Sequence, residues 1–465
     1  MKKEDTTSLR LAFYGDDFTG STDALEVLAF AGLRCALFLK APSVETLNEL
    51  NGLDAIGIAG DSRGMSPLEM ETKLPPIFEA LVELNVPIVH YKVCSTFDSS
   101  PTIGSIGRAM DIGRRTFRSP FIPVVAGTPA LARYCVFGNL FARSATDGLV
   151  HRIDRHPIMR SHPVTPMDES DLTLHLGRQT TLSIGNFVLP NFEAERAVMD
   201  KSLMDHTASR PDAVLFDTTT HEHLTEVGRM IDAQARQFSP VFVVGSSGVE
   251  YALTQWWQEL YGKRPSTNDY DTFVGVDQVL AISGSASPLS ALQIDEAITA
   301  GFSEIAIDAG ALVDDSSWQA SLGALVSQVL TLLRQGRSVI LHTARGPSDA
   351  RIAAMIDSLV RHGYSTERAT HQGGRLLGMR LGAITDAVLR AIPIRRLLLS
   401  GGDTSSQITQ ILAPDALEIQ ARLAPGAPLC RVISKQQHLR GLEIALKGGQ
   451  MGDKRFFVHA LRGNA

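Results

Sequence analysis

Short, wholly apolar segments alternate along the chain with stretches in which apolar residues recur at the spacing of a helix. Strands buried on both faces have this unbroken apolar character, and helices between such strands are typical of parallel sheets. The pattern predicts a helix at Thr22–Ala31 that ends before Gly32, and strands at Leu9–Tyr14, Arg34–Leu39, Ala55–Ala59, Ile88–Tyr91, Ile122–Ala126, Ala213–Asp217 and Val241–Val244. The fold class that follows is α/β with largely parallel sheets.

A polar segment, Gln258–Phe273, interrupts this alternation. The pattern then resumes, with strands expected at Val279–Ser283, Glu304–Ile307, Ser338–His342 and Arg396–Leu399. Because polar, proline-containing linkers commonly separate domains, we predict two α/β domains, residues 1–268 and 269–465. Residues 151–180 are irregular in pattern and are expected to form a long surface excursion.

The composition narrows the classes of partner. The 465 residues are 44% hydrophobic and carry a net charge of −6, which argues against a nucleic-acid or anionic-membrane partner. No apolar run reaches about 18 residues and no signal peptide is recognisable, so we expect no membrane segment and a cytoplasmic location. The four cysteines form no C-x-x-C pair and are expected to be free thiols.

Two adjacent carboxylates, Asp16 and Asp17, lie in the run Gly15–Asp23, directly after the first predicted strand. Ligands of open α/β sheets bind at the carboxyl ends of strands, where a carboxylate can accept the proton of a substrate hydroxyl or hold that hydroxyl in line. The alternative is a solvated turn in which Asp16 or Ser21 caps the following helix.

A second loop with polar side chains follows another predicted strand and carries Lys92, Cys94, Ser95 and Thr96. A lysine and hydroxyl groups at a strand end suit an anionic ligand such as a carboxylate or a phosphate. Arg63, after the third strand, could clamp a carboxylate through two parallel hydrogen bonds. The alternatives are a Ser/Thr-rich loop with a surface lysine, and an arginine on the surface.

Two turns in the second half of the chain suit a phosphate group. They are Ser283–Pro288, with Ser285 in the turn and Ser287 at the predicted start of a helix, and Ser400–Ser406, with Gly401, Gly402, Asp403 and Thr404. A third glycine cluster, Lys447–Gly452 with Gly448 and Gly449, would by itself pass as a hairpin turn. Backbone N–H groups at a helix N-terminus bind phosphate, and glycines let the backbone approach a ligand closely. Asp403 and Thr404 could reach a phosphate-bound metal ion or a ribose. The alternative for the first turn is a capped helix without a ligand.

Several familiar signatures do not occur in the sequence. It contains no Walker A loop, no G-x-G-x-x-G fingerprint, no H-E-x-x-H and no G-x-S-x-G. His151, His156 and His162 do not have the spacing of a zinc site, so we predict no metal centre held by protein ligands alone.

The run GDDFTGSTD resembles the N-terminal signature of the four-carbon acid sugar kinases, and ISGSASP, LSGGDTSS and ALKGGQMGD resemble the glycine turns of that family in the same order. The resemblance implies an ATP-dependent kinase whose N-terminal domain binds a small sugar acid and whose C-terminal domain binds ATP with Mg²⁺. It also implies that the two ligands meet in a cleft between the domains. It also implies a homodimer. By this resemblance Asp16 and Asp17 form the acidic pair, Arg63 binds a carboxylate, and Lys92, Cys94, Ser95 and Thr96 form the second substrate loop. Ser285, Ser287, Gly401–Thr404, Gly448 and Gly449 would bind the nucleotide.

The run Cys94–Ser99 is similar to the branch of the family that phosphorylates 3-oxo-tetronates and related 3-oxo acids. That branch usually continues with Gly-Asn-Ile-Gly, whereas this chain has Ser105 in place of the asparagine. We therefore expect a four-carbon, or a five-carbon or branched, 3-oxo acid as substrate. Asp17 is expected to position the terminal hydroxyl and accept its proton, with Asp16 orienting the loop or contacting substrate hydroxyls.

Two other classes of protein share part of this pattern. An NAD(P)-dependent oxidoreductase acting on a sugar acid would have a similar two-domain sequence, although the missing G-x-G-x-x-G argues against it. A non-catalytic binding protein for sugar acids would not need the glycine turns of the second half of the chain, which suit a phosphate group.

Overall fold

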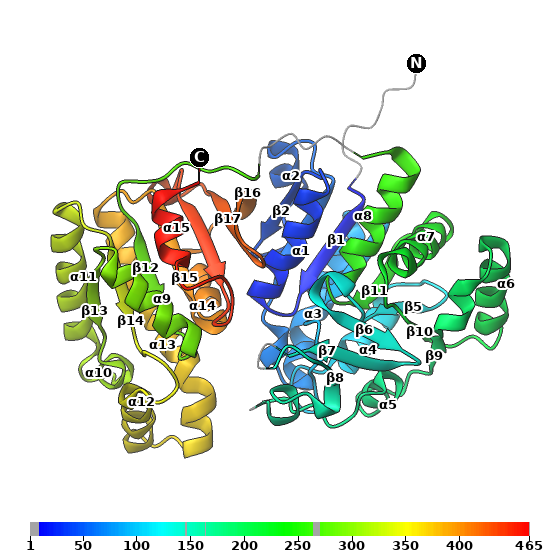
Figure 1. Ribbon diagram of the computed structural model, residues 1–465, viewed down its shortest axis with the longest axis horizontal. Coiled ribbons are helices and arrows are strands. Elements are labelled where there is room, and N and C mark those ends of the chain that lie inside the picture. Colours follow the sequence, from blue (N-terminus) through cyan, green and yellow to red (C-terminus); the bar gives the residue numbers. More distant parts are fainter. Residues whose placement is uncertain (1–8, 145–146, 163, 264–269, 465) are drawn as a thin grey trace. The chain divides into compact units, whose positions relative to one another are not determined.

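The apolar segments form strands of mostly parallel β-sheet in the computed structural model, which describes residues 9–144, 147–162, 164–263 and 270–464 (Figure 1). The chain divides into two compact units, Met1–Ala36 with Lys40–Ser266 and Leu37–Leu39 with Thr267–Ala465. The predicted α/β class is therefore confirmed. The predicted boundary at 268/269 lies outside the described residues, and the cleft stays a prediction.

Unit 1 contains strands in the order β2-β3-β1-β4-β11-β5-β10-β9, of which β2 belongs to unit 2 from Leu37 onward. Its strands are β1 (Leu11–Gly15), β2 (Cys35–Phe38), β3 (Ala55–Ala59), β4 (Ile88–Lys92), β5 (Ile122–Val125), β9 (Ile184–Phe187), β10 (Ala213–Phe216) and β11 (Val241–Gly245). Its helices are α1 (Phe18–Phe30), α2 (Val44–Glu49), α3 (Pro67–Glu83), α4 (Ile106–Thr116), α5 (Leu172–Gly177), α6 (Arg196–Thr207), α7 (His221–Gln237) and α8 (Gly248–Tyr261). A small antiparallel sheet, β6 (Arg133–Val136), β7 (Asn139–Arg143) and β8 (Val150–Arg152), was not predicted.

Unit 2 contains strands in the order β13-β14-β12-β15-β18-β17-β16, of which β17 and β16 are antiparallel to their neighbours. The strands are β12 (Leu280–Ser283), β13 (Ser303–Ala306), β14 (Val339–His342), β15 (Arg396–Ser400), β16 (Ala416–Ala424), β17 (Ala427–Ile433) and β18 (Glu443–Lys447). The helices are α9 (Pro288–Thr299), α10 (Ala309–Val313), α11 (Trp318–Arg334), α12 (Ala350–Arg361), α13 (Thr366–Ala391), α14 (Gly402–Leu412) and α15 (Phe456–Arg462).

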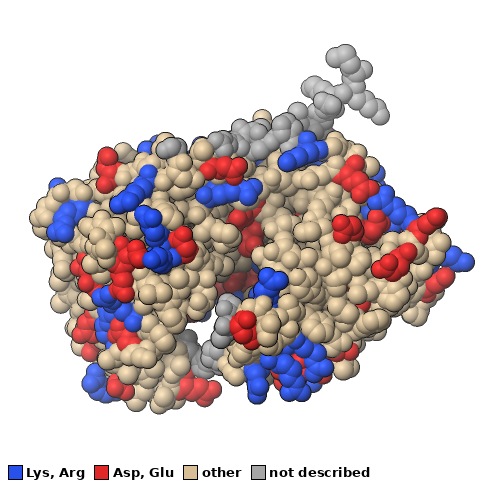
Figure 2. Space-filling view, in the orientation of Figure 1, with Lys and Arg blue, Asp and Glu red and all other residues tan. Residues whose placement is uncertain are grey.

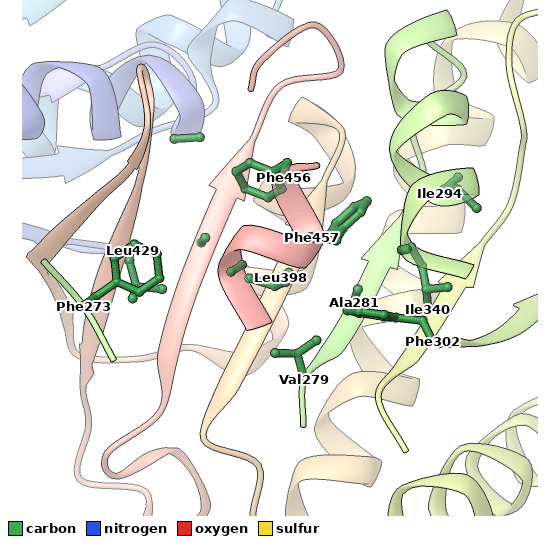
Figure 3. Close-up of a cluster of buried hydrophobic side chains, with 14 of the residues drawn as sticks. Phe273, Val279, Ala281, Ile294, Phe302, Ile340, Leu398, Leu429, Phe456 and Phe457 are labelled. Atoms are coloured by element: carbon green, nitrogen blue, oxygen red, sulfur yellow. The ribbon is translucent and has the colours of Figure 1, made fainter. Parts of the chain in front are cut away.

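The strands of unit 2 bury both faces, as their unbroken apolar sequences predict. Ala281, Leu398 and Ala445 belong to one buried cluster with residues of helices α9 and α15. Figure 3 shows Leu398 and Ala281 of the strands with Ile294 of α9 and Phe456 and Phe457 of α15. Because successive residues of a strand face opposite sides, the alternate residues lie in the core of the other face.

Residues 151–180 are not the surface excursion that their polar composition suggested. They include β8, short 3-10 turns and α5, and Thr165, Met167 and His175 are buried. Two of their polar side chains, Thr165 and His175, bond to Asp98 and Ser99 of the loop that follows β4, so this segment packs against that loop.

The distribution of charged side chains on the surface agrees with the near balance of basic and acidic residues in the sequence. On the face drawn in Figure 2, basic and acidic side chains are interspersed. Among the helices that the structure describes, none combines the length and the apolar content that crossing a bilayer requires.

Arg396 is a fully buried cation that ties unit 2 together. Its Nε and Nη2 donate to Glu443 Oε2 at 2.7 and 2.5 Å, and Nη2 donates to the carbonyl of Val274 at 3.0 Å. Its guanidinium also donates to the carbonyl of Ala460 in α15 and lies 5.3 Å from the ring centre of Phe273.

We expect Arg396→Met to lower the free energy of unfolding by about 3–5 kcal/mol, because it leaves the buried carboxylate of Glu443 without its main cation. Urea unfolding measures this change. Arg395→Met is the matched control, since Arg395 is 54% exposed and lies 3.3 Å from the same carboxylate, so its loss should cost about 0–1 kcal/mol. Equal effects of the two substitutions would contradict the assignment.

Candidate active site

The ends of β1, β3 and β4 bring the predicted acid-binding residues of unit 1 together. The strands are parallel neighbours in register, with Gly15 opposite Lys92 and Ala59. Beyond them the Asp16 N–H donates to the carbonyl of Lys92 at 2.8 Å, and the Arg63 N–H donates to the carbonyl of Asp16 at 3.0 Å. The acidic turn, the turn that holds Arg63 and the Lys92 loop are therefore joined by backbone hydrogen bonds.

Asp17, and neither Asp16 nor Ser21, caps helix α1. Its Oδ1 accepts the Gly20 N–H at 2.6 Å, which satisfies one of the free amides of the first turn. Its Oδ2 accepts from Nη1 of Arg63 at 3.0 Å. A Cβ on Gly20 would lie 2.5 Å from Asp17 Oδ1 and 2.6 Å from Lys92 Nζ, so a glycine is needed where these side chains converge.

Asp98 is a third acidic residue of the site, and the sequence analysis did not select it. Its carboxylate accepts from Arg63 Nη2 at 2.6 Å, from the Thr96 hydroxyl at 2.5 Å and from the Thr165 hydroxyl at 2.9 Å. Burial opposes ionisation, but Arg63 and the hydrogen bonds of Thr96 outweigh it and hold the pKa of Asp98 at about 2. Asp98 lies two residues after Thr96, in a loop that the sequence analysis had already selected, and this closeness in sequence could have identified it as a candidate site residue.

Asp16 has the opposite environment. Its side chain is 5% exposed, and Oδ1 has no hydrogen-bond partner among the described residues. Burial, together with the neighbouring charge of Asp17, raises the pKa of Asp16 to about 7. Asp16 is thus a carboxyl group that can change protonation state near neutral pH.

The remaining predicted residues line the same loop. Lys92 is 3% exposed, with its Nζ 3.9 Å from Asp23 Oδ2. Burial opposes its charge, but Asp23, Asp17 and Asp16 raise the pKa of Lys92. Cys94 and Ser95 are half-buried, and burial raises the pKa of the Cys94 thiol, so this cysteine is not an activated nucleophile.

In unit 2 the three predicted turns meet at the carboxyl ends of β12, β15 and β18. The Gly284 N–H donates to the carbonyl of Ser400 at 2.9 Å, and the Gly401 N–H donates to the carbonyl of Lys447 at 2.9 Å. Gly401 has φ +111°, which favours glycine, and a Cβ on Gly284 would lie 1.9 Å from the Thr404 hydroxyl oxygen. The glycines therefore allow the turns to approach one another.

Helix α14 begins directly from the Gly401 turn and has no side-chain cap. The first-turn residues Gly402 and Asp403 are exposed, and Thr404 is buried. The amides of this turn have no partner within the helix and carry the positive end of its dipole, which suits a phosphate group.

The other two turns pack together beside it. Ser287 caps α9 by accepting the Ser290 N–H at 3.0 Å, with Pro288 as the first helical residue, as predicted. The Ser287 hydroxyl donates to the carbonyl of Gly449 at 2.5 Å, and a Cβ on Gly449 would lie 2.5 Å from the Ser285 hydroxyl oxygen. The turn at Gly448 and Gly449 follows the parallel strand β18 and is not a hairpin.

Lys447, the last residue of β18, lies beside the glycine turns of unit 2, and the sequence analysis did not select it. It is fully buried, and its Nζ donates to the Ser400 hydroxyl at 3.0 Å and lies 3.5 Å from that of Ser290. It forms no ion pair with the described residues, and burial lowers its pKa to about 8. Unlike Lys92, this cation lies beneath the turns without a carboxylate partner.

No group of three or more His, Cys, Asp or Glu side chains in the described ranges has the geometry of a metal site. Magnesium bound with nucleotide phosphates needs only one or two protein carboxylates, because phosphates and water supply its other ligands. The exposed Asp403 beside the Gly401 turn fits that requirement.

Two family models match the two halves of this chain. The family model for a sugar-binding N-terminal domain matches residues 11–253, and the model for a nucleotide-binding C-terminal domain matches residues 280–457. A 3-oxo-isoapionate kinase from Paraburkholderia graminis is 41% identical over 97% of this chain and 93% of its own. A 3-oxo-tetronate kinase from Brucella melitensis is 25% identical over 97% of this chain and 95% of its own.

A crystal structure of a Salmonella typhimurium LT2 protein has the same fold. It matches with a TM-score of 0.75 and 22% identity, over 98% of this chain and 99% of that one.

Proposed function

The chain belongs to the four-carbon acid sugar kinase family and is an ATP-dependent sugar acid kinase, and we propose that its substrate is a 3-oxo acid of the kind named for its 41% identical relative. That identity over 97% of the chain is the observation that carries the proposal. The 3-oxo-tetronate kinase, at 25%, is more distant. A 3-oxo-tetronate is therefore the second candidate substrate.

The contacts of unit 1 favour Asp16 as the proton acceptor. Asp17 already accepts from the Gly20 amide and from Arg63, whereas Asp16 has an oxygen without a partner and a pKa of about 7. A general base works best when its pKa lies near the working pH. We infer that Asp16 accepts the proton of the attacking hydroxyl, and that Asp17 with Arg63 holds the loop that positions it.

The nucleotide phosphates are proposed to bind the turns of unit 2. Backbone amides of Gly402–Thr404 and of the Gly449 turn would donate to phosphate oxygens, and Lys447 would supply positive charge beneath them. Phosphoryl transfer requires mainly positioning and neutralisation of charge, and these groups provide both.

Magnesium is proposed to accompany ATP, with Asp403 as a protein ligand. When bound, the ion would neutralise charge on the phosphates. The homodimer and the cytoplasmic location stay predictions.

The test is an ADP-release assay over a panel of acids. We expect ADP formation to require both ATP and an acid, with the highest kcat/KM for 3-oxo-isoapionate and a lower value for 3-oxo-tetronate. The same acids with NAD(P) are the control and should give no change in nicotinamide absorbance. ADP formation no faster with any acid than without one would contradict the proposed function.

A further inference from the structure

Arg133, the first residue of β6, has a guanidinium group whose Nη1 is held by hydrogen bonds to backbone carbonyls. Nη1 donates to the carbonyl of Leu131 at 3.0 Å, of Ala132 at 3.3 Å and of Arg143 at 3.3 Å. These three carbonyls orient the group, so its remaining N–H groups point in a defined direction.

The other edge of this guanidinium, formed by Nε and Nη2, has no partner among the described residues. Nε is buried and makes no hydrogen bond, and Arg133 forms no ion pair within the part of the chain that the structure describes. This edge is the one that holds a carboxylate in Arg351, whose Nε and Nη2 donate to the two oxygens of Asp349 at 3.0 and 2.6 Å. Its geometry therefore matches a carboxylate through two parallel bonds.

Arg133 differs in charge balance from Arg63, the arginine that the family resemblance assigns to the substrate's carboxylate. Arg63 is held between Asp17 and Asp98, so its charge is already compensated. Burial lowers the pKa of Arg133, but an arginine stays protonated in proteins. A partly buried cation without a counter-ion is costly, and a bound anion would offset that cost.

Hydrogen bonds connect the backbone of Arg133 to the strand ends that carry the Lys92 loop. Its backbone exchanges two hydrogen bonds with Thr128, after β5, at 2.9 and 3.1 Å, and the Thr128 hydroxyl contacts that of Ser246, after β11, at 2.6 Å. The Val93 N–H donates to the carbonyl of Gly245 at 2.7 Å, which links the same edge to the Lys92 loop.

We propose that Arg133 binds the carboxylate of the sugar acid through Nε and Nη2. The carboxylates of Asp16, Asp17 and Asp98 then face the hydroxyl-bearing part of the substrate, where acceptors are required and a second anion would be repelled. Arg133 thus selects acids over neutral sugars. This assignment rests on the proposed function, because it requires a sugar acid as substrate.

The test compares a preferred acid with its neutral amide in wild-type protein and in Arg133→Met. We expect the substitution to raise KM for the acid about a hundredfold, since it removes two charge-assisted hydrogen bonds, and to change kcat less than about tenfold. The wild type should prefer the acid to the amide, and Arg133→Met should lose that preference. Arg133→Lys should fall between them, since lysine keeps the charge but loses the fork.

Arg143→Met is the matched control, because Arg143 is an exposed cation on the neighbouring strand, and its KM for the acid should stay at the wild-type value. ADP affinity, measured by calorimetry, should be the same in all variants. An Arg133→Met protein that still prefers the acid as strongly as wild type would refute the assignment of Arg133 alone, whereas a wild type that turns over no acid would refute the proposed function. If Arg133→Met does not fold, Arg133→Lys decides, and an unchanged KM in that variant overturns the assignment.

Discussion

Replacing Asp16 with asparagine is expected to slow phosphoryl transfer about a thousandfold, within the range that a general base contributes. Asparagine has nearly the same shape but cannot accept the proton of the hydroxyl. ADP should bind as in wild type, because its proposed turns lie in unit 2. Single-turnover rates with saturating ATP and acid measure the effect, and calorimetry with ADP checks the binding.

Asp17→Asn is the matched comparison for this prediction. Asparagine caps a helix as well as aspartate does, so the substitution removes mainly the ion pair with Arg63, and we expect a loss of about tenfold. A loss of a thousandfold in Asp17→Asn with only a small loss in Asp16→Asn would restore Asp17 as the base.

The pH profile gives an independent readout of the same group. Asp16 must be ionised to accept a proton, so wild-type kcat/KM should fall about tenfold for each pH unit below about 7. The residual activity of Asp16→Asn should lack this acid limb. If the residual kcat/KM of Asp16→Asn still falls at low pH as in wild type, a group other than Asp16 causes that fall.

Replacing Gly401 with valine is expected to weaken ATP and ADP binding about a hundredfold or more. Gly401 has φ +111°, and a Cβ there would lie 3.2 Å from the Ser285 amide nitrogen and 3.3 Å from the Thr404 hydroxyl. A side chain in such a conformation costs about 1–3 kcal/mol, and shifting the turn also misplaces the first amides of α14. Calorimetric titration with ADP measures the loss.

Gly441→Val separates backbone strain from loss of the nucleotide site. Gly441 also has a positive φ, +76°, in the same unit, but nothing lies within 4 Å of a Cβ built on it. This variant should lose some stability and keep its ADP affinity. Normal ADP binding by Gly401→Val would contradict the proposal that the nucleotide phosphates bind at the Gly401 turn.

The sequence predicted most of the strands that carry the site with little error, but it did not predict β18, which ends at Lys447. Ala55–Ala59 is β3 without change, Gly32 follows α1 with a positive φ, and Ser287 and Pro288 start α9 as expected. Such features are local, because apolar runs, caps and glycine turns act within a few residues of themselves. The antiparallel strands β16 and β17 were not predicted, and neither were β9 and β18.

What the sequence alone determined is the α/β class, the order of the loops and the residue types at the ends of the strands. Only the tertiary structure decided which of these residues pair. Thr165 comes from a segment predicted to be a surface excursion, yet it bonds to Asp98. Arg63 forms ion pairs with Asp17 and Asp98, whereas Arg133 forms none with the residues that the structure describes. Burial and charge pairing depend on what packs nearby in space, and residues far apart in the chain supply those neighbours.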